Sequence, residues 1–134
     1  MANVAGFKTK VQAWGKEREA FRVRYDFSKD GGAQGFLGLF DVEGKHIVES
    51  AKIVGITSPA SLGSATVSVG KASDAAGIVA AAAIADLEAG EVAFGAAQDA
   101  SHVLADGDAV GMTIATADLT DGVLDFLFEL QKLS

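Results

Sequence analysis

The sequence predicts a mainly all-β fold: an antiparallel β-sandwich or jelly roll with one short helical segment near residues 74–87. Two observations predict it. Four runs alternate apolar and polar residues with the period of two that is typical of a half-buried strand: Phe21–Phe27, Ser64–Gly70, Val110–Thr116 and Val123–Leu130. Glycine, aspartate and serine separate such runs at short intervals, as turns do in all-β proteins.

The apolar members of these runs predict the core. In each run one set of side chains must point to the same face of a sheet. The expected core residues are Phe21, Val23, Tyr25, Phe27, Val67, Val69, Met112, Ile114, Phe126 and Phe128. In the last run, Asp125 and Glu129 are expected to face solvent.

The turn chemistry predicts a hairpin near the start of the chain. Residues 28–35 (SKDGGAQG) contain Asp-Gly and Gly-Gly steps, which supply the positive φ values of tight turns. Phe36–Val42 is therefore expected to pair with Phe21–Phe27. The connecting loop is longer than most hairpin loops, which also makes it a candidate binding surface.

The middle of the chain predicts a strand, a stop and a short helix. The strand through Ile53 and Ile56 is expected to end at Pro59, because proline removes a donor from the ladder. Ser73 or Asp74 is a plausible N-cap for a helix running to Leu87. Two weak strands at 91–96 and 102–104 and a turn at 117–122 complete the prediction.

Composition excludes several classes of protein. With 134 residues the chain is expected to form one folded domain with an adequate core. It has no cysteine, so disulfides and thiolate metal sites are excluded. The start of the chain lacks the pattern of a signal peptide, and the longest apolar run is too short to span a membrane. We therefore expect a soluble protein that is not exported.

Charge is unevenly distributed along the chain. Residues 1–29 contain seven basic and three acidic residues, a formal charge of +4, so the remainder carries −11 of the total of −7. The basic residues are interrupted by Glu17, Glu19 and Asp26, unlike the dense positive stripe of a nucleic-acid binder. The distribution fits two solvated strand faces, or a basic segment that lies on an acidic neighbour.

The residues do not form a recognisable catalytic or metal-binding motif. His46 and His102 lack metal-ligand spacing, and a surface or half-buried role is expected for both. There is no Gly-x-Ser-x-Gly elbow, and Gly63–Lys71 departs from a phosphate loop in its spacing. Asp106, Asp108, Asp118 and Asp121 could offer oxygen ligands to calcium, but Asp-Gly is also a common turn dipeptide. We expect no catalytic residue, no cofactor and no metal.

The order of strands and turns resembles a family. An Ile/Val strand ends in Thr57-Ser58-Pro59; then come Ser64-Ala-Thr-Val-Ser-Val-Gly70, a turn at Ser73-Asp74, Leu104-Ala-Asp-Gly-Asp108 and the run Met112–Gly122. This pattern, over residues 36–130, resembles the small β-sandwich structural proteins of tailed bacteriophages, including head decoration or cement proteins. The basic segment through Lys29 has no counterpart in it.

The resemblance implies a non-enzymatic virion protein, made in the host cytoplasm. It would bind the major capsid protein or other virion subunits on the outer surface of a head as a homo-oligomer, with no nucleic acid or membrane as partner. A tail, neck or fibre component, or a carbohydrate-binding or hydrolytic sandwich, are the alternatives.

The N-terminal segment is the expected docking element of such a protein. Residues 1–20 lack clean alternation and are interpreted as an extended basic arm, with residues 21–134 as the sandwich domain. The arm and the adjoining strand face supply apolar anchors and positive charges for a partner: Phe7, Lys8, Lys10, Val11, Trp14, Lys16, Arg18, Arg22 and Arg24. Trp14 is either such an anchor or a buried cap of the sandwich. The loops at 28–35 and 58–64 are the alternative docking surface.

Overall fold

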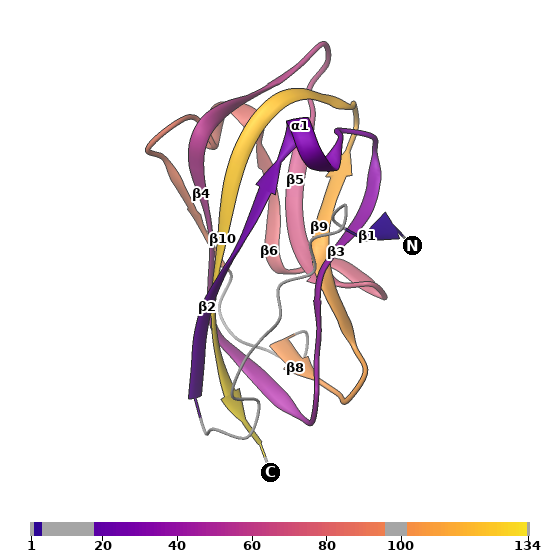
Figure 1. The fold of residues 1–134 in the computed structure, drawn as a ribbon, viewed down its shortest axis with the longest axis vertical. Helices are drawn as coiled ribbons and strands as arrows, with labels where there is room; N and C mark the ends of the chain where they lie inside the picture. Colours follow the sequence, from indigo (N-terminus) through magenta and orange to yellow (C-terminus); the bar gives the residue numbers. More distant parts are fainter. Residues whose placement is uncertain (1, 4–17, 96–101, 134) are drawn as a thin grey trace.

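The computed structural model describes residues 2–3, 18–95 and 102–133, and shows two β-sheets packed face to face (Figure 1). Sheet A has the strand order β1-β3-β9-β5-β6, and sheet B has the order β2-β10-β4-β7, with β8 also paired to β4. The strands are β1 (Ala2–Asn3), β2 (Arg18–Asp26), β3 (Gly35–Asp41), β4 (His46–Ser61), β5 (Thr66–Lys71), β6 (Asp74–Ala83), β7 (Val92–Phe94), β8 (Val103–Leu104), β9 (Ala109–Ala115) and β10 (Leu119–Lys132). Two short helical turns, α1 (Phe27–Asp30) and η1 (Ile84–Asp86), complete the fold.

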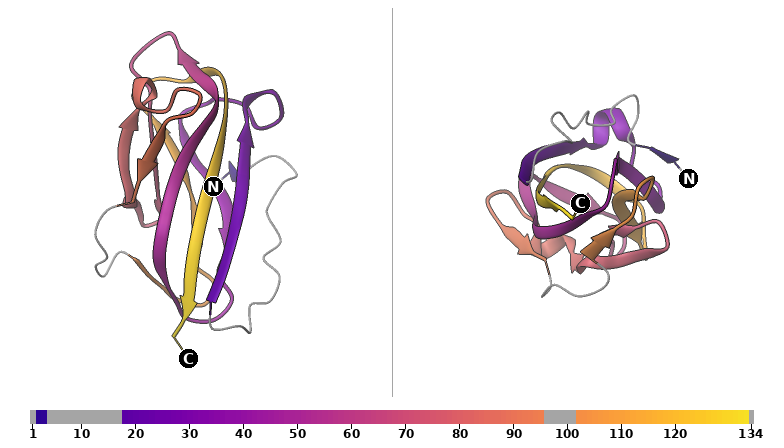
Figure 2. Two further views of the ribbon diagram at one scale, coloured as in Figure 1. Left: turned by 90° about the vertical axis from the view of Figure 1, so that its left-hand side faces the viewer. Right: turned by 90° about the horizontal axis from the view of Figure 1, so that it is seen from below.

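The predicted all-β sandwich is confirmed. All strand pairs are antiparallel except the short pair of β1 with β3, which is parallel. The two further views show long strands of sheet B curving around one side of the molecule (Figure 2). Among the described residues, no helix is long and apolar enough to cross a membrane.

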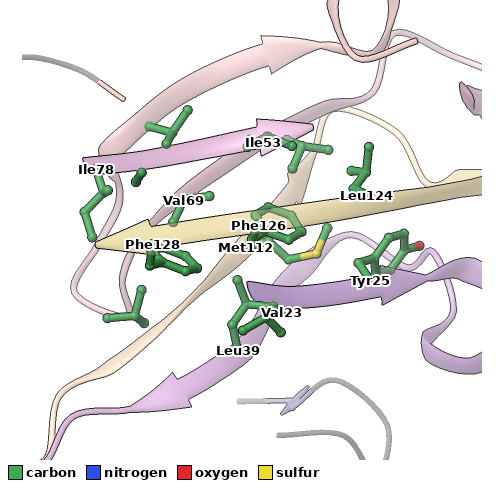
Figure 3. Close-up of a cluster of buried hydrophobic side chains, with 14 of the residues drawn as sticks. Val23, Tyr25, Leu39, Ile53, Val69, Ile78, Met112, Leu124, Phe126 and Phe128 are labelled. Atoms are coloured by element: carbon green, nitrogen blue, oxygen red, sulfur yellow. The ribbon is translucent and has the colours of Figure 1, made fainter. Parts of the chain in front are cut away.

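The core lies between the sheets and is filled by the apolar positions of the alternating runs (Figure 3). Phe126 of β10 lies opposite Val23 of β2 and Ile53 of β4, and all three side chains are fully buried. Sheet A contributes Val69 and Met112 to the same cluster. Of the ten predicted core residues, eight are buried, and Phe21 and Phe27 are partly buried against the core.

Three phenylalanines join the sheets at one place in the core. The Phe40 ring of β3 makes T-shaped contacts with Phe21 and Phe128, with centroid distances of 4.9 and 5.0 Å, and the Phe21 and Phe128 rings stack at 5.6 Å. Edge-to-face and offset aromatic pairs add to the stabilisation that burial alone provides. Phe21 was predicted to face the core from its alternating run, and in the structure it does so as a member of this cluster.

The predicted hairpin between 21–27 and 36–42 is wrong. β2 pairs with β10 in sheet B, whereas β3 pairs with β9 and β1 in sheet A. The chain turns away from β2 because Asp26 caps α1, its Oδ1 accepting hydrogen bonds from the Ser28 N–H and hydroxyl at 3.0 and 2.7 Å. These bonds lower the pKa of Asp26. Gly31, at φ 74°, ends α1 as the turn chemistry predicted, and the chain crosses to the other sheet.

Two hydrogen bonds, one from β10 and one from β2, hold this crossing between the sheets in place. The Leu119 N–H donates to the Gly32 carbonyl at 2.8 Å, and the Tyr25 hydroxyl donates to the Gly31 carbonyl at 2.5 Å. Burial, reinforced by the nearby acidic residues, raises the pKa of Tyr25 well above its usual range, so its hydroxyl stays a donor. Leu119 is far from Gly32 in the sequence, so a hairpin prediction from local sequence does not include this contact.

The expected strand end at Pro59 is also wrong, since β4 continues to Ser61. Thr57 lies opposite Val123 and Ala60 opposite Asp121, so β4 carries one extra residue between these pairs. The intervening Ser58 and Pro59 form a bulge, and at a bulge the strand pairing does not need the backbone N–H that Pro59 lacks.

The same bulge shortens the turn that was predicted at 117–122. Gly122, at φ 133°, lies against Pro59, and a Cβ at this position would be 2.8 Å from the Pro59 Cα. Residues 119–122 therefore belong to β10, and the turn is confined to residues 116–118.

The helical segment expected over residues 74–87 is a strand for most of its length. β6 pairs with β5 through Thr66–Ala83, Val67–Ala82 and Val69–Val79, and only Ile84–Asp86 forms a single 3₁₀ turn. The helix preference of alanine is only a few tenths of a kcal/mol per residue. Pairing with β5 and burial of Ile78 and Val79 outweigh it.

Candidate functional site

The outer face of sheet B carries the described members of the predicted docking surface. Because β2 alternates, Arg22 and Arg24 point away from the core while Val23 and Tyr25 point into it. In register, Arg22 lies opposite Leu127 of β10, and Arg24 lies opposite Asp125. The predicted placement of both arginines on an outer strand face is confirmed.

Asp125 holds the two arginines in place. Arg24 makes a bidentate contact with it, Nε to Oδ1 at 2.7 Å and Nη2 to Oδ2 at 3.0 Å, and Arg22 Nη1 lies 3.7 Å from Oδ2. The hydrogen bond and charge of Asp125 raise the pKa of Arg24. Asp125 was expected to face solvent; it does lie on the outer face, but it is only 5% exposed.

The three charges leave a positive surface. Two guanidinium groups share one carboxylate, and their side chains remain 61% and 44% exposed. Since Asp125 cancels only one of the two positive charges, this part of the face can still attract a carboxylate from a partner. The sequence did not identify Asp125 as the partner, because it lies 101 residues from Arg24.

A shallow hollow adjoins Arg22 on the same face. It has a volume of about 370 Å³, and Ala20 and Leu127 supply apolar surface while Lys52 and Glu129 supply charges. A hollow of this composition can bind an apolar side chain of a partner protein, with a polar or charged residue of the partner beside it.

The structure does not describe most of the other predicted docking residues, which are Phe7, Lys8, Lys10, Val11, Trp14 and Lys16. For Arg18 it describes the backbone only. Arg18 is the first residue of β2 and lies opposite Gln131 of β10. Near the other end of the arm, Ala2 and Asn3 pair in parallel with Leu37 and Gly38 of β3.

The alternative docking surface, the loops at 28–35 and 58–64, lies at the end of the molecule where α1 is labelled (Figure 1). Asp118 joins these loops: its Oδ1 accepts from the Gln34 N–H at 3.0 Å, and its carbonyl accepts from the Ser61 hydroxyl at 2.7 Å. Leu62 is 98% exposed beside a hollow of about 440 Å³. Thr116, on the hollow's rim, has the left-handed φ of 75°, a strained conformation for a β-branched residue.

The two histidines have structural surroundings. A surface or half-buried position was expected, but His46 and His102 are only 1% and 3% exposed. β8 pairs with β4 through His46–Leu104 and Ile47–Val103, which packs this region in a way that local sequence does not predict. His46 Nδ1 lies 3.1 Å from the Gly44 carbonyl.

Each of the four aspartates considered for calcium accepts a hydrogen bond from a backbone N–H. Within the described residues, no group of three or more metal-ligating side chains is present. The bonds run from Gly44 to Asp106, from Ala105 to Asp108, from Gln34 to Asp118 and from Gly122 to Asp121, at 2.8 to 3.0 Å. For Asp106, Asp108 and Asp118 these contacts are those of turn-stabilising side chains, whereas Asp121 lies within β10.

We expect the melting temperature to be the same with and without a calcium chelator. Each of the four carboxylates is engaged by a backbone N–H, so stability should not depend on an added ion. Differential scanning calorimetry of the full chain measures this. A fall of many degrees, restored by added calcium, would identify the aspartates as ligands.

The fold is similar to that of a chain in the solved structure described as "Capsid of Ralstonia phage GP4". The TM-score is 0.60 at 18% sequence identity, and the match covers 100% of this chain and 92% of that chain. No protein-family model and no curated protein matches the sequence. At this identity the similarity establishes a shared fold over the whole length of the chain.

Proposed function

We propose that this protein is a non-enzymatic structural protein of a phage virion, and that it decorates the outer surface of the head and stabilises it. The observation that carries the proposal is the full-length fold similarity to a chain of a phage capsid structure. The described residues support it, because they present charged and apolar sheet surface for protein contacts. A carbohydrate-binding role is less well supported, since Phe94 is the only large exposed aromatic of the described residues.

The arm and the arginine face together provide the proposed docking surface. A specific interface buries about 1,600 Å² in total, and an extended segment beside a sheet face is an economical way for a small domain to reach that area. Arg22 lines the hollow, and with Arg24 it continues the basic character of residues 1–20. The acidic remainder of the chain then faces solvent. Lys29 is exposed on α1, at the end of β2 opposite to the arm.

Removal of residues 1–17 is expected to abolish binding to heads assembled without this protein. The cut preserves all of β2, which begins at Arg18. Cosedimentation of purified protein with heads measures binding, and circular dichroism with thermal melting shows whether the truncated chain is folded. If a folded truncated chain binds with unchanged affinity, the docking surface lies instead on the loops at 28–35 or 58–64. If the full chain does not bind heads, the proposed decoration of heads is wrong, and a role in the tail, neck or fibre becomes the hypothesis to test.

Arg22→Glu is expected to weaken head binding about two- to fivefold, because an exposed ion pair contributes little by itself. The matched control is Lys29→Glu, which makes the same charge change on α1, outside the arm and the arginine face. Salt should weaken attachment only in part, since the apolar anchors of the arm are not screened. Equal effects of the two substitutions would show that only net charge matters, and would remove Arg22 from the docking surface.

A further inference from the structure

Four side chains form a row across the outer face of sheet B. In register, Arg22 of β2 lies opposite Leu127 of β10, which lies opposite Lys52 of β4. Lys52 in turn lies opposite Phe94 of β7. Residues in register point to the same face of a sheet, and this face is the outer one, because Ile53 next to Lys52 is fully buried. We call Arg22, Leu127, Lys52 and Phe94 the cross-strand row; the left view of Figure 2 shows this side of the molecule.

The row is exposed at both ends and hollowed between them. The Arg22 side chain is 61% exposed and Phe94 is 71% exposed, whereas Leu127 and Lys52 are half-buried. Arg22, Leu127 and Lys52 all line the hollow of about 370 Å³. Because Phe94 lies beside Lys52, it continues the surface of the hollow to the edge of sheet B opposite β2.

Positive charge alternates with apolar surface along the row. Arg22 and Lys52 are two strands apart, about 10 Å at the usual strand spacing, with Leu127 between them. Asp125 lies in the neighbouring row and makes its hydrogen bonds with Arg24, whereas Arg22 is 3.7 Å from it. The row itself contains no acidic residue, so carboxylates of a partner can approach both of its cations.

The two neighbouring rows keep the surface positive. On one side Arg24 and Asp125 are followed by Val54 and by Val92, which is 39% exposed. On the other side Glu129 is the charged residue. Three cations thus stand against two carboxylates over the three rows, an excess of one positive charge. The apolar side chains of β7 belong to this positive surface, which indicates a partner with both carboxylates and apolar anchors.

We propose that the cross-strand row is the part of the docking surface that recognises the head, and that its ligand is an extended acidic segment of a head subunit. The segment crosses the four strands of sheet B, with carboxylates at Arg22 and Lys52 and apolar side chains in the hollow and against Phe94. The inference rests on the proposed function and extends the docking surface from the arginine face to β7. The basic arm and the row are then attracted to the same acidic partner.

Binding of single variants to heads assembled without this protein tests the row. Phe94→Ser is expected to weaken binding about tenfold or more, as loss of an aromatic anchor does. Leu62→Ser is its matched control, because Leu62 is 98% exposed but lies in the β4–β5 loop. Lys52→Glu should weaken binding about two- to tenfold, since it replaces an attraction by a repulsion, and Lys29→Glu is its control. Thermal melting shows whether each variant is folded.

The outcomes separate this inference from the proposed function. If the unaltered chain binds heads and both row variants bind as tightly as their controls, decoration stands and the inference is wrong. A larger effect of Leu62→Ser than of Phe94→Ser would also overturn it, in favour of the loops at 28–35 and 58–64. If the unaltered chain does not bind heads, the proposed function is wrong and the inference falls with it.

Crosslinking of the bound protein identifies the chemistry of the ligand. A carbodiimide activates a carboxylate, which then forms an amide bond with a lysine amine in contact with it. In the complex of the full chain with heads, we expect mass spectrometry to find Lys52 joined to an aspartate or glutamate of a head subunit. A second copy of this chain, with its net charge of −7, is the other acidic candidate. Crosslinks from Lys52 to this chain alone, within one copy or between two, would overturn the proposal.

Discussion

Replacing Phe126 by alanine is expected to lower the free energy of unfolding by about 3 to 5 kcal/mol, as is usual when a large core side chain leaves a cavity. Phe126 is fully buried in β10, the strand that pairs with both β2 and β4. Its neighbours in register, Val23 and Ile53, are held in the sheet by backbone hydrogen bonds, so they cannot move far enough to fill the space. Urea denaturation at equilibrium measures the change.

The matched control for this substitution is Phe94→Ala. It removes the same side chain from a position that is 71% exposed, and it should change the stability of the monomer much less. A loss below about 1 kcal/mol for Phe126→Ala, well under the usual cost of a cavity, would show that the inward face of β10 is assigned to the wrong set of residues.

Gly55→Ala is expected to destabilise the fold by about 3 kcal/mol or more, at or above the upper end of the usual cost of overpacking. A Cβ at Gly55 would lie 2.2 Å from the carbonyl oxygens of both Leu87 and Glu88. Neither β4 nor the segment after η1 can move away easily, because hydrogen bonds join them. The Gly55 N–H donates to Glu91 O at 2.9 Å, and its carbonyl accepts from the Gly90 N–H at 2.8 Å.

Gly107→Ala separates this steric effect from the general cost of replacing glycine. A Cβ at Gly107 would meet open space, so only the left-handed φ of 87° is unfavourable there, at about 1 kcal/mol. Denaturation curves of the two variants give the comparison. A loss for Gly55→Ala that does not exceed the loss for Gly107→Ala would mean that the segment after η1 moves away from β4 at little cost.

Only part of the proposed docking surface could be predicted from local sequence patterns. Alternation in β2 placed Arg22 and Arg24 on an outer face, because a strand's period is a local property. The partner that holds them, Asp125, could be found only from the register of β2 with β10. Phe94 lay in a weakly predicted strand, and its exposure depends on β7 being at the edge of sheet B.

Local sequence was sufficient to predict the all-β class, the inward faces of the alternating strands and the positive φ of Gly31. These follow from the chemistry of neighbouring residues. Three features depend on pairing between distant parts of the chain: β2 and β3 belong to different sheets, β4 passes through Pro59, and the alanine-rich stretch 74–83 is a strand. In each case the local preference amounts to a few kcal/mol at most, and pairing with a strand distant in sequence outweighs or accommodates it by burying apolar side chains and completing backbone hydrogen bonds.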